Sequence, residues 1–135
     1  MEARQEELHS AFTQPRSLPA SFGAAFRGLF NLLRTQRNMR VHLAITAVVA
    51  ALAAALGVSW CDWLFLVLAV ALVLVAEALN TAVEALVDLV SPEKRPLAGR
   101  AKDLAAAAVL LAAFFAVVIG ALVFLPHLRP LVFGS

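Results

Sequence analysis

The segment EALNTAVEALVD, which ends at Asp88, carries the side chains of this sequence that are best suited to chemistry. On a helix of about 100° per residue, Glu77, Asn80, Glu84 and Asp88 fall within an arc of about 80° and so share one face. The residues before them, 63–76, are entirely apolar, so this polar face ends a hydrophobic run. An acid inside the hydrocarbon layer costs at least about 2.5 to 3.5 kcal/mol, and such residues usually serve a function.

Oxygen ligands on one face suit Mg²⁺, a hard cation that takes one or two carboxylates and adds water and phosphate oxygens. The adjoining segment SPEKRPLAGRAKD, residues 91–103, contributes four cations at the same membrane level: Lys94, Arg95, Arg100 and Lys102. Phosphoryl transfer needs an activated nucleophile, neutralised charge and positioned phosphates, and these groups can supply all three. The sequence has no Walker A or protein-kinase motif, so a nucleotide site here would be of another design.

These residues also have plain structural explanations. Asn80 can bond a neighbouring helix, Asp88 can be solvated at the interface, and loop cations set membrane topology. His42 is more typical of a solvated or helix-bonded side chain than of a ligand, and the single cysteine, Cys61, indicates neither a disulfide nor a zinc site. Acids rarely lie in membrane spans without a function. Glu77 and Glu84 together therefore favour a site for chemistry over a purely structural role.

Three apolar stretches position this face, namely residues 41–58, 63–87 and 104–125. The first and last contain 18 and 22 residues. At about 1.5 Å per residue they measure about 27 and 33 Å, enough to cross a hydrocarbon layer of about 30 Å. A soluble bundle is disfavoured, because the last stretch has no charge on any side and the chain is 62% hydrophobic. We therefore predict an all-α integral membrane protein with three transmembrane helices.

An amphipathic helix at the membrane surface is predicted to precede the first span. Its apolar side chains recur at helical spacing: Phe22, Ala25, Phe26, Leu29, Leu32 and Leu33. A flexible leader of residues 1–20 comes before it, and a tail of residues 126–135 follows the membrane domain. Ten of the eleven basic residues lie before Val41 or within 91–103, which predicts a cytoplasmic N-terminus, a cytoplasmic 91–103 loop and an external C-terminus. A cytosolic extension of the first span is the alternative for the surface helix.

Two motifs, ExxNTAxExxVDxxSxE and LxGRAKD, read EALNTAVEALVDLVSPE and LAGRAKD here. They resemble the prokaryotic diacylglycerol kinase family, small integral membrane enzymes that include the undecaprenol kinases. The similarity covers roughly residues 21–125. It implies a homotrimer of three-span protomers in the bacterial inner (plasma) membrane, each with an N-terminal surface helix. It also implies transfer of the γ-phosphoryl of MgATP to a membrane lipid alcohol, with ATP, lipid and bilayer as partners and no nucleic acid.

The resemblance also implies roles for individual residues. Glu77 matches the general base of the family, and Glu84 matches an acid that binds Mg²⁺. Nucleotide-binding positions are matched by Asn80, Asp88, Glu93, Arg95, Lys102 and Asp103. One departure is Gln36, in TQRNMRVH, where the family often has a second metal-binding glutamate; a neutral amide oxygen attracts Mg²⁺ less strongly. Arg100 is a further candidate for neutralising phosphate charge.

The acceptor lipid is expected to be diacylglycerol, which would give phosphatidic acid. Undecaprenol, giving undecaprenyl phosphate, is the alternative, because NTAVE, VDLVSPE and Pro96 resemble the undecaprenol branch whereas GRAKD resembles the diacylglycerol branch. A small proton-coupled transporter would use Glu77 differently, but it predicts charge near mid-membrane and access from both sides. A packing or regulatory subunit would leave Glu77 and Glu84 without a role.

Overall fold

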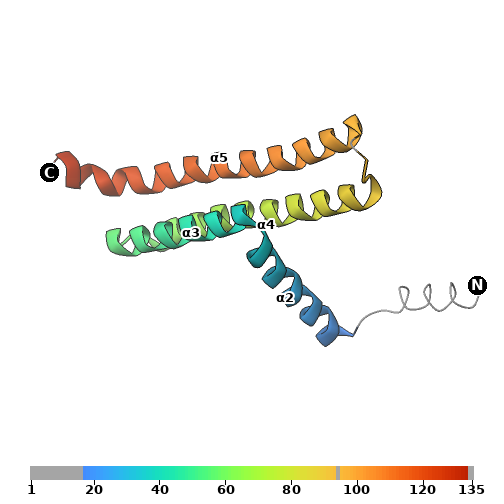
Figure 1. The fold of residues 1–135 in the computed structure, drawn as a ribbon. Coiled ribbons are helices and arrows are strands. Elements are labelled where there is room, and N and C mark those ends of the chain that lie inside the picture. Colours follow the sequence, from blue (N-terminus) through green and yellow to red (C-terminus); the bar gives the residue numbers. More distant parts are fainter. Residues whose placement is uncertain (1–16, 94, 134–135) are drawn as a thin grey trace, which may run out of the picture. The chain divides into compact units, whose positions relative to one another are not determined.

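The computed structural model describes residues 17–93 and 95–133, and these residues form four helices and no strand. The helices are α2 (Leu18–Thr35), α3 (Arg37–Leu56), α4 (Trp60–Val90) and α5 (Pro96–Phe133), coloured from blue to red in Figure 1. Helices α3, α4 and α5 are each long and apolar enough to cross a membrane. The predicted all-α membrane fold with three spans is confirmed.

Helix α2 has the amphipathic character expected of the N-terminal segment. None of its residues is buried, and large apolar side chains along it are exposed, among them Phe22, Phe26 and Phe30. The helix begins at Leu18, so the last three residues of the predicted leader are helical, because a proline such as Pro19 is tolerated in the first helical turn. The remainder of the predicted leader, residues 1–16, lies outside the described residues.

A tight turn joins α3 to α4. Gly57 has φ 63° and ψ 38°, a left-handed conformation that favours glycine, and the amide of Val58 donates to the carbonyl of Ala53 at 3.2 Å. Ser59 then caps α4: its hydroxyl accepts from the amide of Asp62, and the Asp62 carboxylate accepts from the amide of Ser59. These two caps keep the turn short, so α4 already begins at Trp60, three residues before the predicted 63–87 stretch.

The segment between α4 and α5 differs most from the prediction. Only residues 91–95 connect the two helices, so the predicted 91–103 loop is wrong from Pro96 onward. Proline is favoured at a first helical position, and α5 continues from there as one helix to Phe133. Residues 126–133 of the predicted tail are therefore helical too. Hydropathy marks depth in the bilayer rather than the ends of helices, which explains why the predicted loop was too long.

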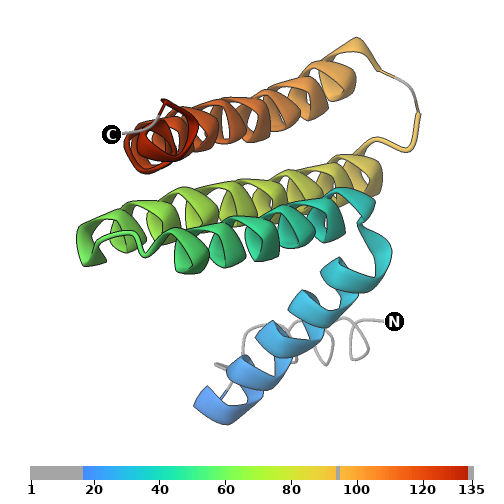
Figure 2. The same ribbon diagram turned by 90° about the vertical axis from the view of Figure 1, so that its left-hand side faces the viewer.

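The core lies at the end of the spans nearest the Gly57 turn. Helix α4 packs most extensively along α5, and α3 packs on α4 (Figure 1, Figure 2). The buried cluster there consists of Ala53, Val58, Leu66 and Val123. His127 of α5 reaches to within 4.0 Å of the Asp62 carboxylate at the same end. The opposite end of α4 has no comparable apolar cluster among the described residues, and it carries the polar face.

Candidate active site

The polar face of α4 starts inside the protein. The buried residues of α4 are Leu66, Ala69, Val73, Glu77 and Asn80, spaced by three and four residues and so aligned on one face. Glu77 is only 2% exposed, and Asn80 is 8% exposed. An apolar packing face thus continues without interruption into an acid and an amide.

Two oxygen atoms of this buried pair have no hydrogen-bond partner in the described part of the chain, Glu77 Oε2 and Asn80 Oδ1. The Asn80 amide does donate to Glu84 Oε1 at 3.3 Å, and the Thr81 hydroxyl donates to the Glu77 carbonyl at 3.1 Å. A buried polar atom left unpaired costs about 1 to 3 kcal/mol, more when it is charged. Both oxygens are enclosed by the protein, and a group that donates a proton or a positive charge to them would satisfy their unmade hydrogen bonds.

The face becomes more exposed toward the end of α4. Glu84 is half-buried and Asp88 is exposed. Counted from Trp60 at about 1.5 Å per residue, Glu77 lies about 26 Å along the helix, Glu84 about 36 Å and Asp88 about 42 Å. A hydrocarbon layer of about 30 Å that started at Trp60 would end near Glu77, and the other two acids would lie in the interfacial region beyond it. Glu77, Asn80, Glu84 and Asp88 thus form a polar ladder along α4, which runs from the hydrocarbon layer toward water.

A cation from the next helix reaches this ladder. Lys102 of α5 places its ammonium 2.5 Å from a carboxylate oxygen of Asp88, fourteen residues away in sequence. Both side chains are partly exposed, so the ion pair contributes at most about 1 kcal/mol to stability. The ion pair also holds a positive charge beside Asp88 at the exposed end of the polar face. An anion that arrives from water would meet this charge.

The other predicted site residues are not hydrogen-bonded or ion-paired to the polar face of α4 in the described part of the chain. Glu93 and Arg95 pair with one another at 3.5 Å and are both well exposed, and Arg100 and Asp103 lie exposed on α5. Gln36 is half-buried just before α3, and its side chain makes no capping hydrogen bond. The structure thus joins Lys102 to Asp88, whereas Gln36, Glu93, Arg95, Arg100 and Asp103 form no hydrogen bond or ion pair with the acids of α4 in the described part of the chain.

Comparison with known proteins decides the family. Residues 23–124 match the family model for prokaryotic diacylglycerol kinase. The chain belongs to this family. It is 39% identical over 108 residues to the undecaprenol kinase of Bacillus subtilis, covering 80% of this chain and 88% of the relative. It is 41% identical over 130 residues to the diacylglycerol kinase of Synechocystis, covering 96% of this chain and 74% of the relative. The Escherichia coli diacylglycerol kinase is 43% identical over 75 residues, covering 52% of this chain and 62% of the relative.

As a member of the prokaryotic diacylglycerol kinase family, the chain is a membrane lipid kinase of bacterial type. Kinases act on a magnesium nucleotide, and the donor set of α4 fits that ion. It consists of oxygen ligands only, with Glu84 half-buried beside the unpaired oxygens of Glu77 and Asn80. No group of three metal-ligating side chains occurs in the described residues, but Mg²⁺ bound with phosphates needs only one or two carboxylates.

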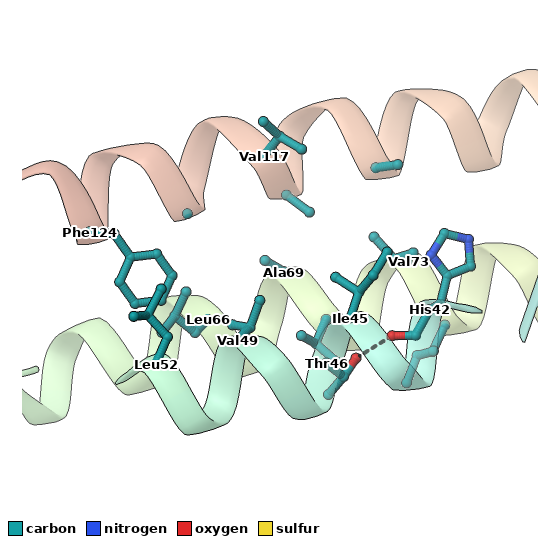
Figure 3. A pocket seen from close by; sticks show the side chains of 15 residues that line it. His42, Ile45, Thr46, Val49, Leu52, Leu66, Ala69, Val73, Val117 and Phe124 are labelled. Atoms are coloured by element: carbon teal, nitrogen blue, oxygen red, sulfur yellow. Dashed lines mark hydrogen bonds between the residues drawn. The ribbon is translucent and has the colours of Figure 1, made fainter. Parts of the chain in front are cut away.

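Sequence reasoning missed one feature of this kinase, a cavity of about 380 Å³ between α3, α4 and α5 (Figure 3). His42 lines it, although the sequence suggested only a solvated or helix-bonded side chain. Small residues at the packing positions leave the space open, including Ala69, Ala116 and Gly120. The four-residue spacing of Ala116 and Gly120 on α5 was an available signal, but such spacing is equally typical of tight helix packing.

Proposed function

We propose that this lipid kinase transfers the γ-phosphoryl of MgATP to the hydroxyl of diacylglycerol, giving phosphatidic acid. The observation that carries the proposal is the buried carboxylate of Glu77, which has an unpaired oxygen and lies at the inner margin of the hydrocarbon layer. A lipid hydroxyl is held at this depth by its own chains. A base intended for a water-soluble acceptor would have no reason to lie there.

In the proposed reaction, the free oxygen of Glu77 accepts the proton of the lipid hydroxyl as that oxygen attacks the γ-phosphorus. A new phosphorus–oxygen bond forms to the lipid, and the bond between the γ-phosphorus and the β,γ-bridging oxygen breaks. ADP leaves with that electron pair. Because Glu77 is held on a packed face of α4 with Val73 and Asn80, its position is set before substrate binds, which lowers the entropic part of the barrier.

The triphosphate is proposed to bind at the exposed part of the ladder. Lys102, with Arg95 and Arg100 nearby in sequence, neutralises the charge that spreads over the transferring group. Further proposed nucleotide contacts come from Asn80, Asp88, Glu93 and Asp103. Glu84, with the amide oxygen of Gln36 as a weaker second ligand, would hold Mg²⁺, which neutralises phosphate charge when bound.

The proposed membrane arrangement follows from charge and exposure. Basic residues before α3 and between α4 and α5 favour a cytoplasmic location for the nucleotide end and the N-terminus, with the C-terminus outside. Many large apolar side chains of α4 and α5 are exposed, such as Leu68 and Leu111, so lipid or further copies of the chain must cover them. A homotrimer in the bacterial plasma membrane is the assembly proposed.

Undecaprenol is the second candidate acceptor. It is favoured by the relative from Bacillus subtilis, named an undecaprenol kinase, of which the alignment covers 88%. A transporter is no longer a candidate for this chain, because the family consists of kinases.

The deciding experiment supplies purified protein in nanodiscs with MgATP labelled at the γ-phosphate and, separately, dioleoylglycerol or undecaprenol. The proposal expects labelled phosphatidic acid to form much faster than labelled undecaprenyl phosphate. If undecaprenol is labelled faster, undecaprenol is the acceptor and the assignment of diacylglycerol is wrong. Release of labelled inorganic phosphate without any labelled lipid would refute lipid phosphorylation altogether.

A further inference from the structure

Two polar side chains that the proposed reaction does not use meet at the end of the spans opposite the polar ladder. Asp62 lies in the first turn of α4, and His127 lies near the end of α5, beside the turn between α3 and α4 (Figure 1). The His127 Nε2 atom is 4.0 Å from Asp62 Oδ2, and the two side chains are only 30% and 25% exposed. The apolar core cluster lies at the same end. A charge formed here is therefore screened less than on an open surface.

The hydrogen bond of His127 indicates which ring nitrogen carries the proton. Its Nδ1 atom lies 2.9 Å from the carbonyl oxygen of Val123, and a carbonyl can only accept, so Nδ1 carries a hydrogen and donates it. In the neutral imidazole the other nitrogen, Nε2, is then a bare acceptor. It faces the Asp62 carboxylate, which also only accepts. The pair thus lacks the proton that would join it, and at 4.0 Å it forms no hydrogen bond.

Asp62 is held in place independently of His127. The hydroxyl of Ser59 donates to Asp62 Oδ2 at 2.7 Å, and the amide of Ser59 donates to the same oxygen at 3.1 Å. The amide of Asp62 in turn donates to the Ser59 hydroxyl. A negative charge is also favoured in the first turn of a helix. The carboxylate is therefore a fixed partner, and only the imidazole must change.

The last turns of α5 depend on such a contact because two prolines weaken them. Pro126 and Pro130 have no amide hydrogen, so each removes one backbone hydrogen bond, and each ring crowds the carbonyl four residues earlier. His127 directly follows the first of these prolines. The backbone alone holds this part of α5 less firmly than the middle of the helix. A side-chain contact to α4 can therefore decide whether the last turns stay packed.

Few other titratable groups lie at this end of the described bundle. Residues 43–60, which include most of α3 and the turn after it, contain none. On α4 the neighbour of Asp62 is Cys61, which is exposed. On α5 the nearest charge is Arg129, which is exposed and lies about 200° around the helix from His127. A change of charge in this region therefore occurs at His127.

We propose that Asp62 and His127 form a clamp that closes on protonation: an imidazole that gains a proton on Nε2 donates a charged hydrogen bond to the Asp62 carboxylate and holds the last turns of α5 against the start of α4. Such a bond is about 2.7 to 2.9 Å long, so the two atoms approach by about 1 Å when the clamp closes. The bond to Val123 is kept, since Nδ1 donates in both states. The clamp is separate from the reaction, because about 22 Å of helix lies between Asp62 and Glu77.

The clamp gives this end of the protein a pH dependence of definite sign. Histidine is the side chain that changes charge between about pH 5 and 8, whereas ordinary carboxylates remain charged throughout this range. The clamp therefore adds stability at the acidic end of the range, where His127 is an imidazolium, and this stability is lost as the pH rises. In the orientation proposed above, this end of the spans faces outward, so acidity outside the membrane would close the clamp.

The test measures unfolding by SDS at about pH 5.5 and about pH 8, at one protein concentration. Unfolding is followed by tryptophan fluorescence, because both tryptophans, Trp60 and Trp63, lie in the first turn of α4 beside the clamp. For each variant, the unfolding equilibrium constant at the higher pH is divided by that at the lower pH. Other titrating groups affect all variants alike, so a difference between these ratios belongs to the pair.

The ratio for wild type should exceed that for His127→Gln by about fivefold, the upper range for a partly exposed ion pair. Asp62→Asn should lose the pH effect just as His127→Gln does. The matched control is Ser59→Ala, which removes the capping hydroxyl but keeps both partners of the clamp. It should be less stable at both pH values and still show the wild-type ratio.

Equal ratios in wild type and His127→Gln would refute the clamp, and so would a wild-type ratio in Asp62→Asn. Loss of the pH effect in Ser59→Ala would assign it to the cap of α4 instead. His42→Gln replaces the other histidine of the described residues and should keep the wild-type ratio. A loss of the effect there would place the titrating group at His42 and overturn the assignment to His127.

Nitrogen NMR of protein labelled with ¹⁵N-histidine tests the position of the proton directly. The signals of His127 are identified by their absence in His127→Gln. At about pH 8, Nδ1 should appear as a protonated nitrogen and Nε2 as an unprotonated one, and at about pH 5.5 both should be protonated. A protonated Nε2 at the higher pH would show that the imidazole already donates toward Asp62 when neutral. The clamp would then have no open state, and the proposal would be wrong.

Discussion

Replacing the buried acid of α4 tests the proposed reaction most directly. In Glu77→Gln the side chain keeps its shape but can no longer accept the hydroxyl proton. General base catalysis contributes about 100- to 10,000-fold, so kcat should fall by that factor, equivalent to about 3 to 5 kcal/mol of barrier. Glu77 is 2% exposed, and glutamine has nearly the same volume and shape, so the packing of α4 is kept and the Tm in detergent should change little.

The assay follows transfer of the labelled γ-phosphate to dioleoylglycerol over a range of MgATP concentrations. Nucleotide binding is assigned to the exposed part of the ladder, so the KM for MgATP should stay close to wild type. Asp62→Asn is the matched control, since it makes the same carboxylate-to-amide change on α4 at the opposite end. It weakens the helix cap without touching the site. A kcat of Glu77→Gln within about threefold of wild type would refute the base assignment, because such a loss is far below the contribution of a general base.

Three further outcomes follow from the structure. Glu84→Gln should raise the Mg²⁺ concentration needed for half-maximal rate by at least about tenfold, measured by metal titration; an unchanged requirement would remove Glu84 as a ligand. Lys102→Met should raise the KM for MgATP about tenfold while changing stability by less than about 1 kcal/mol, because its pair with Asp88 is partly exposed; a large loss of Tm with normal KM would make the pair structural. Gly57→Ala should lower stability by about 1 to 2 kcal/mol through its left-handed conformation, seen as a lower Tm with unchanged kcat; an unchanged Tm would show that the turn relaxes.

Some of the site could be predicted because it depends on local spacing. Glu77, Asn80 and Glu84 lie three and four residues apart, so any helix through them presents them together. The ion pair between Asp88 and Lys102 does not follow from local spacing. It requires α5 to begin at Pro96 and pack along α4, whereas the sequence suggested a loop up to residue 103.

The ends of the helices were predicted less well than their existence. Hydropathy identified three spans, because hydrocarbon excludes long polar stretches from them. The helices themselves extend into the interface, where charged residues such as Arg37 and Lys102 are equally well solvated in a helix. Capping contacts at Gly57 and Ser59 then decided where α3 ends and α4 begins.

The sequence by itself determined the all-helical membrane architecture and the face of α4 that carries the acids, since both follow from side-chain periodicity and from the solvent that each segment requires. Only the tertiary structure decided that Glu77 is buried with an unpaired oxygen while Asp88 is exposed, and that a cavity between α3, α4 and α5 ends about one helical turn from Glu77. Burial and empty space are properties of three helices packed together. They depend on how closely residues as distant as His42, Val73 and Gly120 approach one another, and no local pattern along one segment contains that information.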